Sequence, residues 1–187
     1  MRRFPIPCVI FAGGKSSRMG QDKALLPFRG KPLVRYQYER LLPLFRDVAI
    51  STKSDKFDFQ APLILDSSDV FAPTPAFIDI FERFDRFFAL AVDTPFVDEE
   101  VIARLYDAAE AHPTKDAVVA KTDFPHPLVA IYRKSILPHL KKALEEGNYK
   151  LNAIIRQADT LYVEFGEEEK FFNINYPEDF TRAKNML

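Results

Sequence analysis

A loop between residues 13 and 23 carries the side chains best suited to bind an anion. It reads Gly13-Gly-Lys-Ser-Ser-Arg-Met-Gly20-Gln-Asp-Lys23. Paired glycines allow backbone angles that are closed to other residues, and they leave no Cβ in the way of a ligand. Successive backbone N–H groups in such a turn can hold anionic oxygens, and Lys15, Arg18 and Lys23 add positive charge. This composition favours a phosphate-binding loop over a mobile surface loop of small polar residues.

Two common phosphate-binding motifs do not fit this loop. A Walker A motif ending in Gly14-Lys15-Ser16 requires glycine at position 9, where the chain has valine. A Rossmann G-x-G-x-x-G motif fails because residue 15 is lysine. The loop therefore belongs to another type of phosphate site.

Three groups of residues that could bind a ligand or take part in a reaction each follow an apolar run that is typical of a buried strand. Cys8–Ala12 precedes the glycines, Pro62–Leu65 precedes Asp66, and Phe87–Val92 precedes Asp93. In open parallel sheets, ligands bind outside the carboxyl ends of the strands. We therefore expect the glycine-rich loop and the two aspartates to meet at one edge of a sheet.

Further strands and helices alternate along the chain. The patterns predict strands at 47–51, 117–120 and 128–132, and a strand pair at 160–165 and 171–174 around the acidic turn 166–169. They predict helices from Pro32, over 77–84, after an Asp98 cap, over 134–146 until Gly147, and from Pro177. We expect a single α/β domain over residues 1–187, with a Rossmann-like open, mostly parallel sheet and helices on both faces.

The composition narrows the choice of partners and compartment. The 187 residues are 47% hydrophobic and carry a formal net charge of −1, so a full core is expected and a nucleic-acid partner is not. No apolar run is long enough for a membrane span. The single cysteine, Cys8, allows no internal disulfide and should be buried and inert, in keeping with a cytoplasmic protein.

The first 35 residues carry a family signature. Phe11-Ala-Gly-Gly-Lys-Ser-Ser-Arg-Met-Gly-Gln-Asp-Lys-Ala-Leu-Leu26 resembles the signature of the molybdenum cofactor guanylyltransferases, within the nucleotidyltransferases of the nucleotide-diphospho-sugar transferase-like fold. The resemblance continues through Gly30-Lys31-Pro32-Leu33, Asp93-Thr94-Pro95, His126-Pro127 and Asn173-Ile-Asn-Tyr-Pro-Glu178. It implies transfer of GMP from GTP to the terminal phosphate of molybdopterin, with Mg²⁺ as cofactor and pyrophosphate as the second product. It also suggests a monomer that contacts molybdoenzyme maturation proteins transiently.

The resemblance assigns catalytic roles to three residues. Lys23 would contact the triphosphate, Arg18 would act similarly, and Asp93 would bind Mg²⁺, which typically takes one or two carboxylates plus substrate phosphates. Ordinary alternatives are a solvated loop charge for each basic residue and a turn or N-cap aspartate for Asp93.

The resemblance also assigns the two substrate sites. Asp66 would accept hydrogen bonds from the guanine N1–H and amino group, which favours G over A; its alternative is a turn aspartate in Asp66-Ser-Ser-Asp69. Asparagine amides can bind a pterin edge, although Asn175 is also a candidate N-cap before Pro177. The nucleotide would lie against Phe11, Ala12, Gly13 and Gly14, and molybdopterin against His126, Asn173 and Asn175.

The chain departs from the family pattern at three places. Phe11 replaces the usual leucine, Lys53 stands where the family has an asparagine near the purine, and Ala72-Pro-Thr-Pro-Ala76 replaces Gly-Pro-Leu-Ala-Gly. The resemblance therefore assigns no role to Lys53. Two alternatives stay open, namely a CTP-dependent cytidylyltransferase acting on molybdopterin or another small phosphate acceptor, and a non-catalytic nucleotide-binding module.

Overall fold

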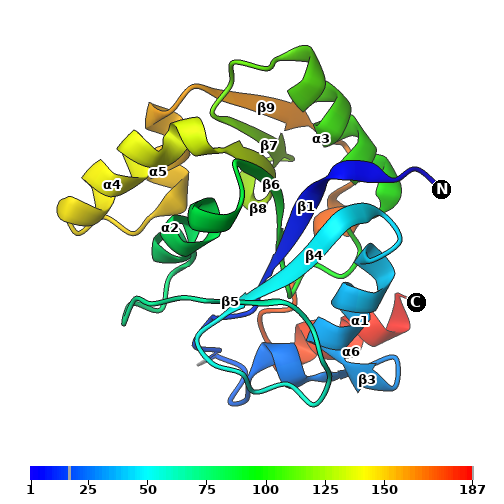
Figure 1. The fold of residues 1–187 in the computed structure, drawn as a ribbon. Helices are drawn as coiled ribbons and strands as arrows, with labels where there is room; N and C mark the ends of the chain where they lie inside the picture. Colours follow the sequence, from blue (N-terminus) through cyan, green and yellow to red (C-terminus); the bar gives the residue numbers. More distant parts are fainter. Residues whose placement is uncertain (17, 187) are drawn as a thin grey trace.

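The computed structural model describes residues 1–16 and 18–186 and is built around a seven-stranded sheet (Figure 1). Residue 17, within the predicted phosphate-binding loop, lies outside the described residues. One half of the sheet is parallel. Its central strand β1 (Phe4–Phe11) pairs with β4 (Phe45–Thr52) and β6 (Arg86–Ala91), and β4 pairs with β5 (Leu63–Leu65).

The other half of the sheet is mixed. Strand β8 (Pro125–Arg133) runs antiparallel to both β6 and β7 (Ala117–Lys121), and β9 (Thr160–Glu164) is parallel to β7. The resulting order is β5-β4-β1-β6-β8-β7-β9. The prediction of a mostly parallel, open α/β sheet is therefore confirmed, with β8 as the strand that reverses direction.

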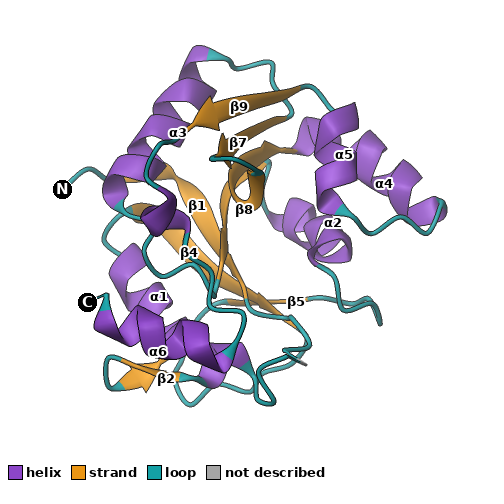
Figure 2. Ribbon diagram, turned by 180° about the vertical axis from the view of Figure 1, so that it is seen from behind, coloured by secondary structure: helices purple, strands orange, loops and turns teal. Residues whose placement is uncertain are grey.

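Helices cover both faces of this sheet, as Figures 1 and 2 show. Alternate residues of β1 enter two separate cores, with Cys8 and Ile10 in one and Val9 and Phe11 in the other. This double burial explains why β1 reads as a continuous apolar run. One face carries α1 (Leu33–Leu41), α3 (Glu99–Ala111) and α6 (Pro177–Asn185), and the other carries α2 (Pro73–Arg83), α4 (Leu137–Glu145) and α5 (Leu151–Gln157).

The smaller elements and caps follow local sequence chemistry. The hairpin of β2 (Pro27–Phe28) and β3 (Lys31–Pro32) turns through Arg29 and Gly30, which both have positive φ. The Asp98 carboxylate accepts the Val101 N–H and caps α3, as predicted. Short 3₁₀ helices lie at η1 (Lys23–Leu25), η2 (Lys134–Ile136) and η3 (Glu168–Phe171).

One prediction of secondary structure is wrong. Residues 171–174 form no strand with 160–165; instead η3 ends at Phe171, and the Ile174 N–H donates to the Asp93 carbonyl at 3.0 Å. The apolar side chains of Phe171 and Ile174 belong to the core rather than to a hairpin. The predicted helix over 134–146 is confirmed, with η2 as its first turn and α4 as its continuation, whereas α5, a seven-residue helix, was not predicted.

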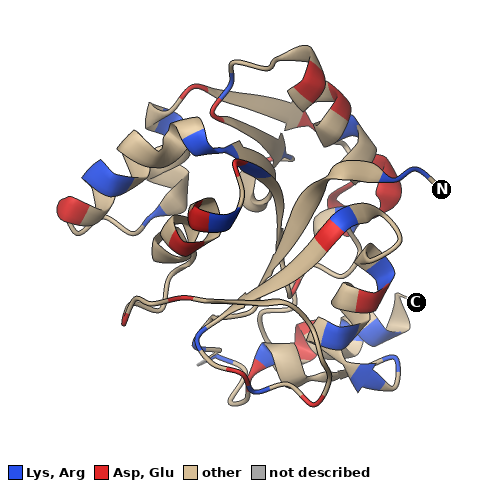
Figure 3. Ribbon diagram, viewed as in Figure 1, with Lys and Arg blue, Asp and Glu red and all other residues tan. Residues whose placement is uncertain are grey.

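Charged residues of both signs are interspersed over the helices and loops, whereas β1 carries none (Figure 3). None of the helices in residues 1–16 and 18–186 combines the length and the apolarity that a membrane crossing needs. Cys8 is buried in β1, and its burial raises the pKa of the thiol far above its usual range. The prediction of a buried thiol is confirmed, and a raised thiol pKa disfavours the reactive thiolate.

Candidate active site

A cavity of about 400 Å³ opens at the carboxyl ends of β1, β5 and β6. Its walls include the glycine-rich loop, Asp66 after β5 and Asp93 after β6. The three segments predicted to meet at one edge of the sheet therefore do so. This volume lies in the range of small-ligand pockets. Nine of the predicted site residues line it, namely Phe11, Ala12, Gly13, Gly14, Arg18, Lys23, Asp66, Asp93 and Asn175.

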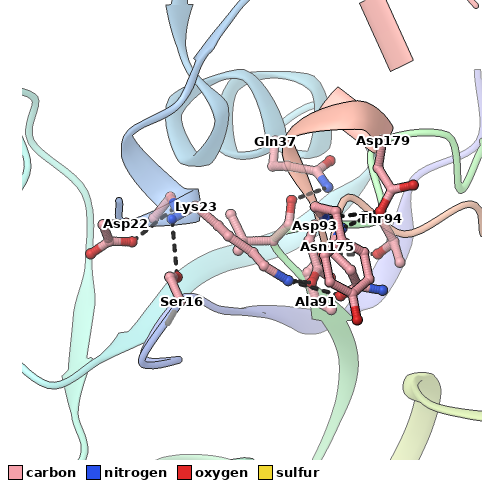
Figure 4. Close-up of polar contacts among 12 residues, drawn as sticks. Ser16, Asp22, Lys23, Gln37, Ala91, Asp93, Thr94, Asn175 and Asp179 are labelled. Carbon is pink, nitrogen blue, oxygen red and sulfur yellow. Dashed lines mark hydrogen bonds and ion pairs between the residues drawn. The ribbon is translucent and has the colours of Figure 1, made fainter. Parts of the chain in front are cut away.

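Lys23 joins the glycine-rich loop to the strand-end aspartate. Its Nζ donates to Asp93 Oδ2 at 2.8 Å and to Asn175 Oδ1 at 2.9 Å (Figure 4). The side chains of Lys23 and Asp93 are 17% and 19% exposed, so this ion pair is largely shielded from water. The backbone of Lys23 is held as well, because its N–H donates to Ser16 Oγ and because Asp22 caps the helical turn that it begins.

The loop that carries Asp93 is fixed by a buried network. Gln37, which is fully buried in α1, donates from Nε2 to the Val92 carbonyl at 3.1 Å and accepts from Arg40 Nε at 2.6 Å. Arg40 in turn donates to the Val97 carbonyl at 2.8 Å, and its burial lowers the pKa of its guanidinium. The backbone on both sides of Asp93 is therefore tied to α1, while the carboxylate faces the cavity.

The glycine-rich loop works differently from the prediction. Gly13 and Gly14 do not adopt positive φ; among the described residues of the loop, Ser16 (φ 50°) and Gly20 (φ 68°) do. A Cβ on Gly14 would meet no atom within 4 Å, so this glycine leaves the cavity wall bare rather than permitting a special backbone angle. Lys56, missed in the sequence, ties the two ends of the loop because its Nζ contacts Asp22 and the Ala12 carbonyl.

Asp66 lines the cavity from the end of β5, which β4 and β1 separate in the sheet from β6, the strand that precedes Asp93. Its side chain is 5% exposed, with Oδ2 at 2.6 Å from Lys53 Nζ and Oδ1 accepting the Ser68 N–H at 2.9 Å. The turn role and the cavity-lining role of Asp66 thus coexist. Phe71, also missed in the sequence, lines the cavity with a half-exposed ring.

The three residues predicted for the acceptor side are only partly brought together. His126 and Asn173 do not line the cavity. The His126 ring stacks on Phe171 at 4.6 Å and shares a hydrogen bond with Thr122, and burial lowers the pKa of the imidazole. Asn175 does reach the cavity.

The interpretation of Asn175 as an N-cap is wrong. Tyr176 occupies the cap of α6, and Asp179 accepts the backbone N–H groups of both Asn175 and Tyr176. Pro177 at the first helical position sets this boundary. The amide of Asn175 is therefore free to bind Lys23 instead of the helix end.

The carboxylate of Asp93 fits a metal site whose other ligands come from the substrate, rather than one built entirely from protein side chains. Within residues 1–16 and 18–186, no group of three or more His, Cys, Asp or Glu side chains could hold a metal by itself. Mg²⁺ commonly takes one or two carboxylates and completes its shell with substrate phosphates and water. Asp93 beside a basic loop suits that arrangement.

An open α/β sheet with a basic, glycine-rich loop after the first strand and an aspartate at the end of a neighbouring strand defines the nucleotidyltransferase class. A family model described as the MobA-like NTP transferase domain matches residues 8–161. The chain belongs to this family, as the sequence predicted.

Relatives over the full length agree with this assignment. A molybdenum cofactor guanylyltransferase of Campylobacter jejuni is 35% identical over 185 residues, covering 96% of each chain. One from Helicobacter pylori is 36% identical over 197 residues, covering 97% of this chain and 93% of that one. The crystal structure of molybdopterin-guanine dinucleotide biosynthesis protein A from Archaeoglobus fulgidus superposes with a TM-score of 0.86 at 26% identity, over 97% of this chain and 98% of that one.

Proposed function

We propose that this protein transfers GMP from GTP to the terminal phosphate of molybdopterin. The observation that carries the proposal is the Lys23–Asp93 pair, 2.8 Å apart in a cavity suited to a nucleotide, in a chain 35% identical to a protein named for this activity. An oxygen of the acceptor phosphate attacks the α-phosphorus of GTP, and the bond from that phosphorus to the bridging oxygen breaks. Pyrophosphate leaves with the electron pair.

Each predicted residue has a role in this reaction. The attacking phosphate is already an oxyanion, so catalysis depends on positioning and charge neutralisation rather than on a general base. Lys23 and Arg18 neutralise the triphosphate. Asp93 would hold Mg²⁺, which would supply further positive charge at the phosphates. The wall formed by residues 11–14 supports the nucleotide, and Asp66 accepts from the guanine edge.

The acceptor and the cellular setting extend the proposal. Of the three residues assigned to molybdopterin, Asn175 lines the cavity and contacts Lys23, whereas His126 and Asn173 do not line it. We expect the enzyme to act as a monomer in the cytoplasm and to contact molybdoenzyme maturation proteins transiently.

Comparing the four nucleotides tests the proposal most directly. With Mg²⁺ present, GTP should raise the thermal unfolding midpoint more than ATP, CTP or UTP, because a ligand at about 100 times its Kd stabilises the folded state by about 2.7 kcal/mol. Transfer of label from α-labelled GTP to molybdopterin then tests the reaction. If CTP stabilises the protein as much as GTP or more, the proposed activity becomes cytidylyl transfer. If GTP binds but no label is transferred, the protein is a non-catalytic nucleotide-binding module.

A further inference from the structure

Lys53 is tied to one cavity loop at three points. Its Nζ lies 2.6 Å from Asp66 Oδ2, donates to the Val70 carbonyl at 2.8 Å and also donates to the Ser68 carbonyl. An ammonium group has three N–H donors. All three are therefore directed at residues 66–70, so Lys53 acts on this loop and not on a ligand.

The loop from Asp66 to Phe71, which we call the base loop, has few other anchors. The Asp66 N–H donates to the Thr52 carbonyl, which continues the β4–β5 ladder. Beyond that point the loop is held by side chains, since the Ser67 N–H donates to Asp79 and the Val70 N–H donates to Ser68 Oγ. The position of the base loop at the cavity therefore depends heavily on the lysine.

The base loop presents two different surfaces to the cavity. One is the Asp66 carboxylate, an acceptor for donors on a base edge. The other is the ring of Phe71, which is 57% exposed and lies with its centroid 5.5 Å from Lys53 Nζ and 5.9 Å from Lys15 Nζ. Exposed aromatic rings beside a charged groove are suited to stacking on bases, and such stacking does not depend on the base.

We propose that Lys53 is a positioning residue that sets the base preference of the nucleotide site, through its hold on Asp66 and Phe71. This inference rests on the proposed use of GTP. A buried carboxylate stays charged at low cost only beside a counter-charge. With that charge in place, Asp66 accepts from the N1–H and amino group of guanine and repels the unprotonated N1 of adenine. Phe71 contributes affinity for either purine.

The test compares GTP and ATP on the full chain. Equilibrium dialysis gives the two Kd values, and steady-state transfer with molybdopterin gives KM and kcat for GTP. The variants are Lys53→Met, Lys53→Arg and Phe71→Leu. The control is Lys115→Met, which removes another paired lysine, 2.6 Å from Asp159 and outside the cavity lining.

Lys53→Met should raise the Kd for GTP at least tenfold and bring the ATP-to-GTP ratio of Kd close to one. It should raise KM while kcat stays within threefold, because the phosphate end of the cavity is untouched. Lys53→Arg, which keeps the charge, should retain most of the preference. Phe71→Leu should raise the Kd for GTP and the Kd for ATP by the same factor, roughly fivefold, because one stacking contact is lost. Lys115→Met should match the wild type.

The outcomes separate this inference from the function on which it rests. Wild-type protein without any preference for GTP would overturn both. A wild-type preference that Lys53→Met retains would overturn only the role of Lys53, even if that variant is less stable. If circular dichroism shows that Lys53→Met is unfolded, Lys53→Gln, which keeps hydrogen-bond donors but no charge, takes its place. It should likewise raise the Kd for GTP and bring the ATP-to-GTP ratio of Kd close to one.

Discussion

The two ends of the cavity are held in position by different means. At the phosphate end, the loop with Asp93 is anchored by Gln37, by Arg40 and by the Ile174 N–H on the Asp93 carbonyl itself. At the base end, a single lysine makes three contacts with the base loop. The first arrangement is redundant and buried, whereas the second rests on two charged side chains, namely Lys53 and the Asp79 carboxylate that accepts from Ser67.

This difference teaches where substitutions should matter. Reaction geometry at a phosphorus tolerates little displacement, and the redundant anchors protect it. The side chain that carries out the chemistry should therefore be irreplaceable at the phosphate end, while its supports should be individually dispensable. At the base end, loss of the supporting Lys53 and loss of the recognising Asp66 should reduce the preference for GTP to a similar degree. Three changes test this contrast, and a fourth concerns a residue outside both ends.

The largest effect is expected for Asp93→Ala. The change removes the carboxylate that binds Mg²⁺ in the proposed reaction, so transfer should fall by about a thousandfold, comparable to losing a strong electrostatic contact to a transition state. The fold should persist, because the loop keeps its backbone anchors. Initial rates over a Mg²⁺ titration and a circular dichroism spectrum measure the two quantities. Asp159→Ala, outside the cavity lining, is the control. Normal turnover with Mg²⁺ would reject the metal assignment.

At the base end, Asp66→Asn should change preference rather than rate. An amide of the same shape presents N–H groups where guanine needs an acceptor, and a hydrogen bond to a charged group is worth about 1.5–3 kcal/mol. The GTP preference over ATP should therefore drop by about 10- to 150-fold, with kcat little changed. Competition between the two nucleotides measures it. A preserved preference would leave Asp66 with its turn role alone, visible in its bond from Ser68.

The sequence allowed the phosphate end to be predicted better than the base end. Apolar runs followed by Gly13 and by Asp93 are local patterns, and the rule that parallel strands share one carboxyl edge brings them together. That rule predicts that Lys23 and Asp93 lie in one cleft, and in the structure they form an ion pair. The same rule places Asp66, and the charge of the loop points to Arg18; both line the cavity, whereas their specific roles come from the family resemblance alone.

The supports could not be predicted from the sequence. Gln37 contacts a residue that is 55 positions away in the sequence, and Lys53 contacts residues that are 13 to 17 positions away. Nothing in the local sequence of either residue marks this role. Phe71 looked like one apolar residue among eighteen phenylalanines. The misassigned strand at 171–174 has the same origin, because the Ile174 N–H finds its partner at Asp93 rather than in a neighbouring strand.

A smaller effect is expected when a single anchor of the phosphate end is removed. Gln37→Leu leaves the Val92 carbonyl without its donor and Arg40 Nε without its acceptor, both buried, so the free energy of unfolding should fall by about 1–3 kcal/mol. Transfer should stay within a few-fold of the wild type, because Arg40 and Ile174 still hold the loop. Urea unfolding and initial rates measure the two quantities. The exposed Gln157→Leu is the control. A loss of activity as large as that of Asp93→Ala would show that the anchors are not redundant.

The smallest effect concerns His126, which lies outside both ends of the cavity. Burial lowers the pKa of its imidazole below the ordinary value of about 6.5, so the unfolded chain takes up a proton before the folded one does. Stability from this residue is therefore fully present above pH 6.5 and is lost as the pH falls through the lower folded value. His126→Gln should flatten that part of the curve of unfolding free energy against pH. The change in unfolding free energy should be smaller than for Gln37→Leu, and the Kd for GTP should be unchanged. Urea unfolding between pH 5 and 8, with the wild type as reference, isolates the contribution. A raised KM for molybdopterin in the same variant, at unchanged GTP affinity, would assign the ring to the acceptor side after all.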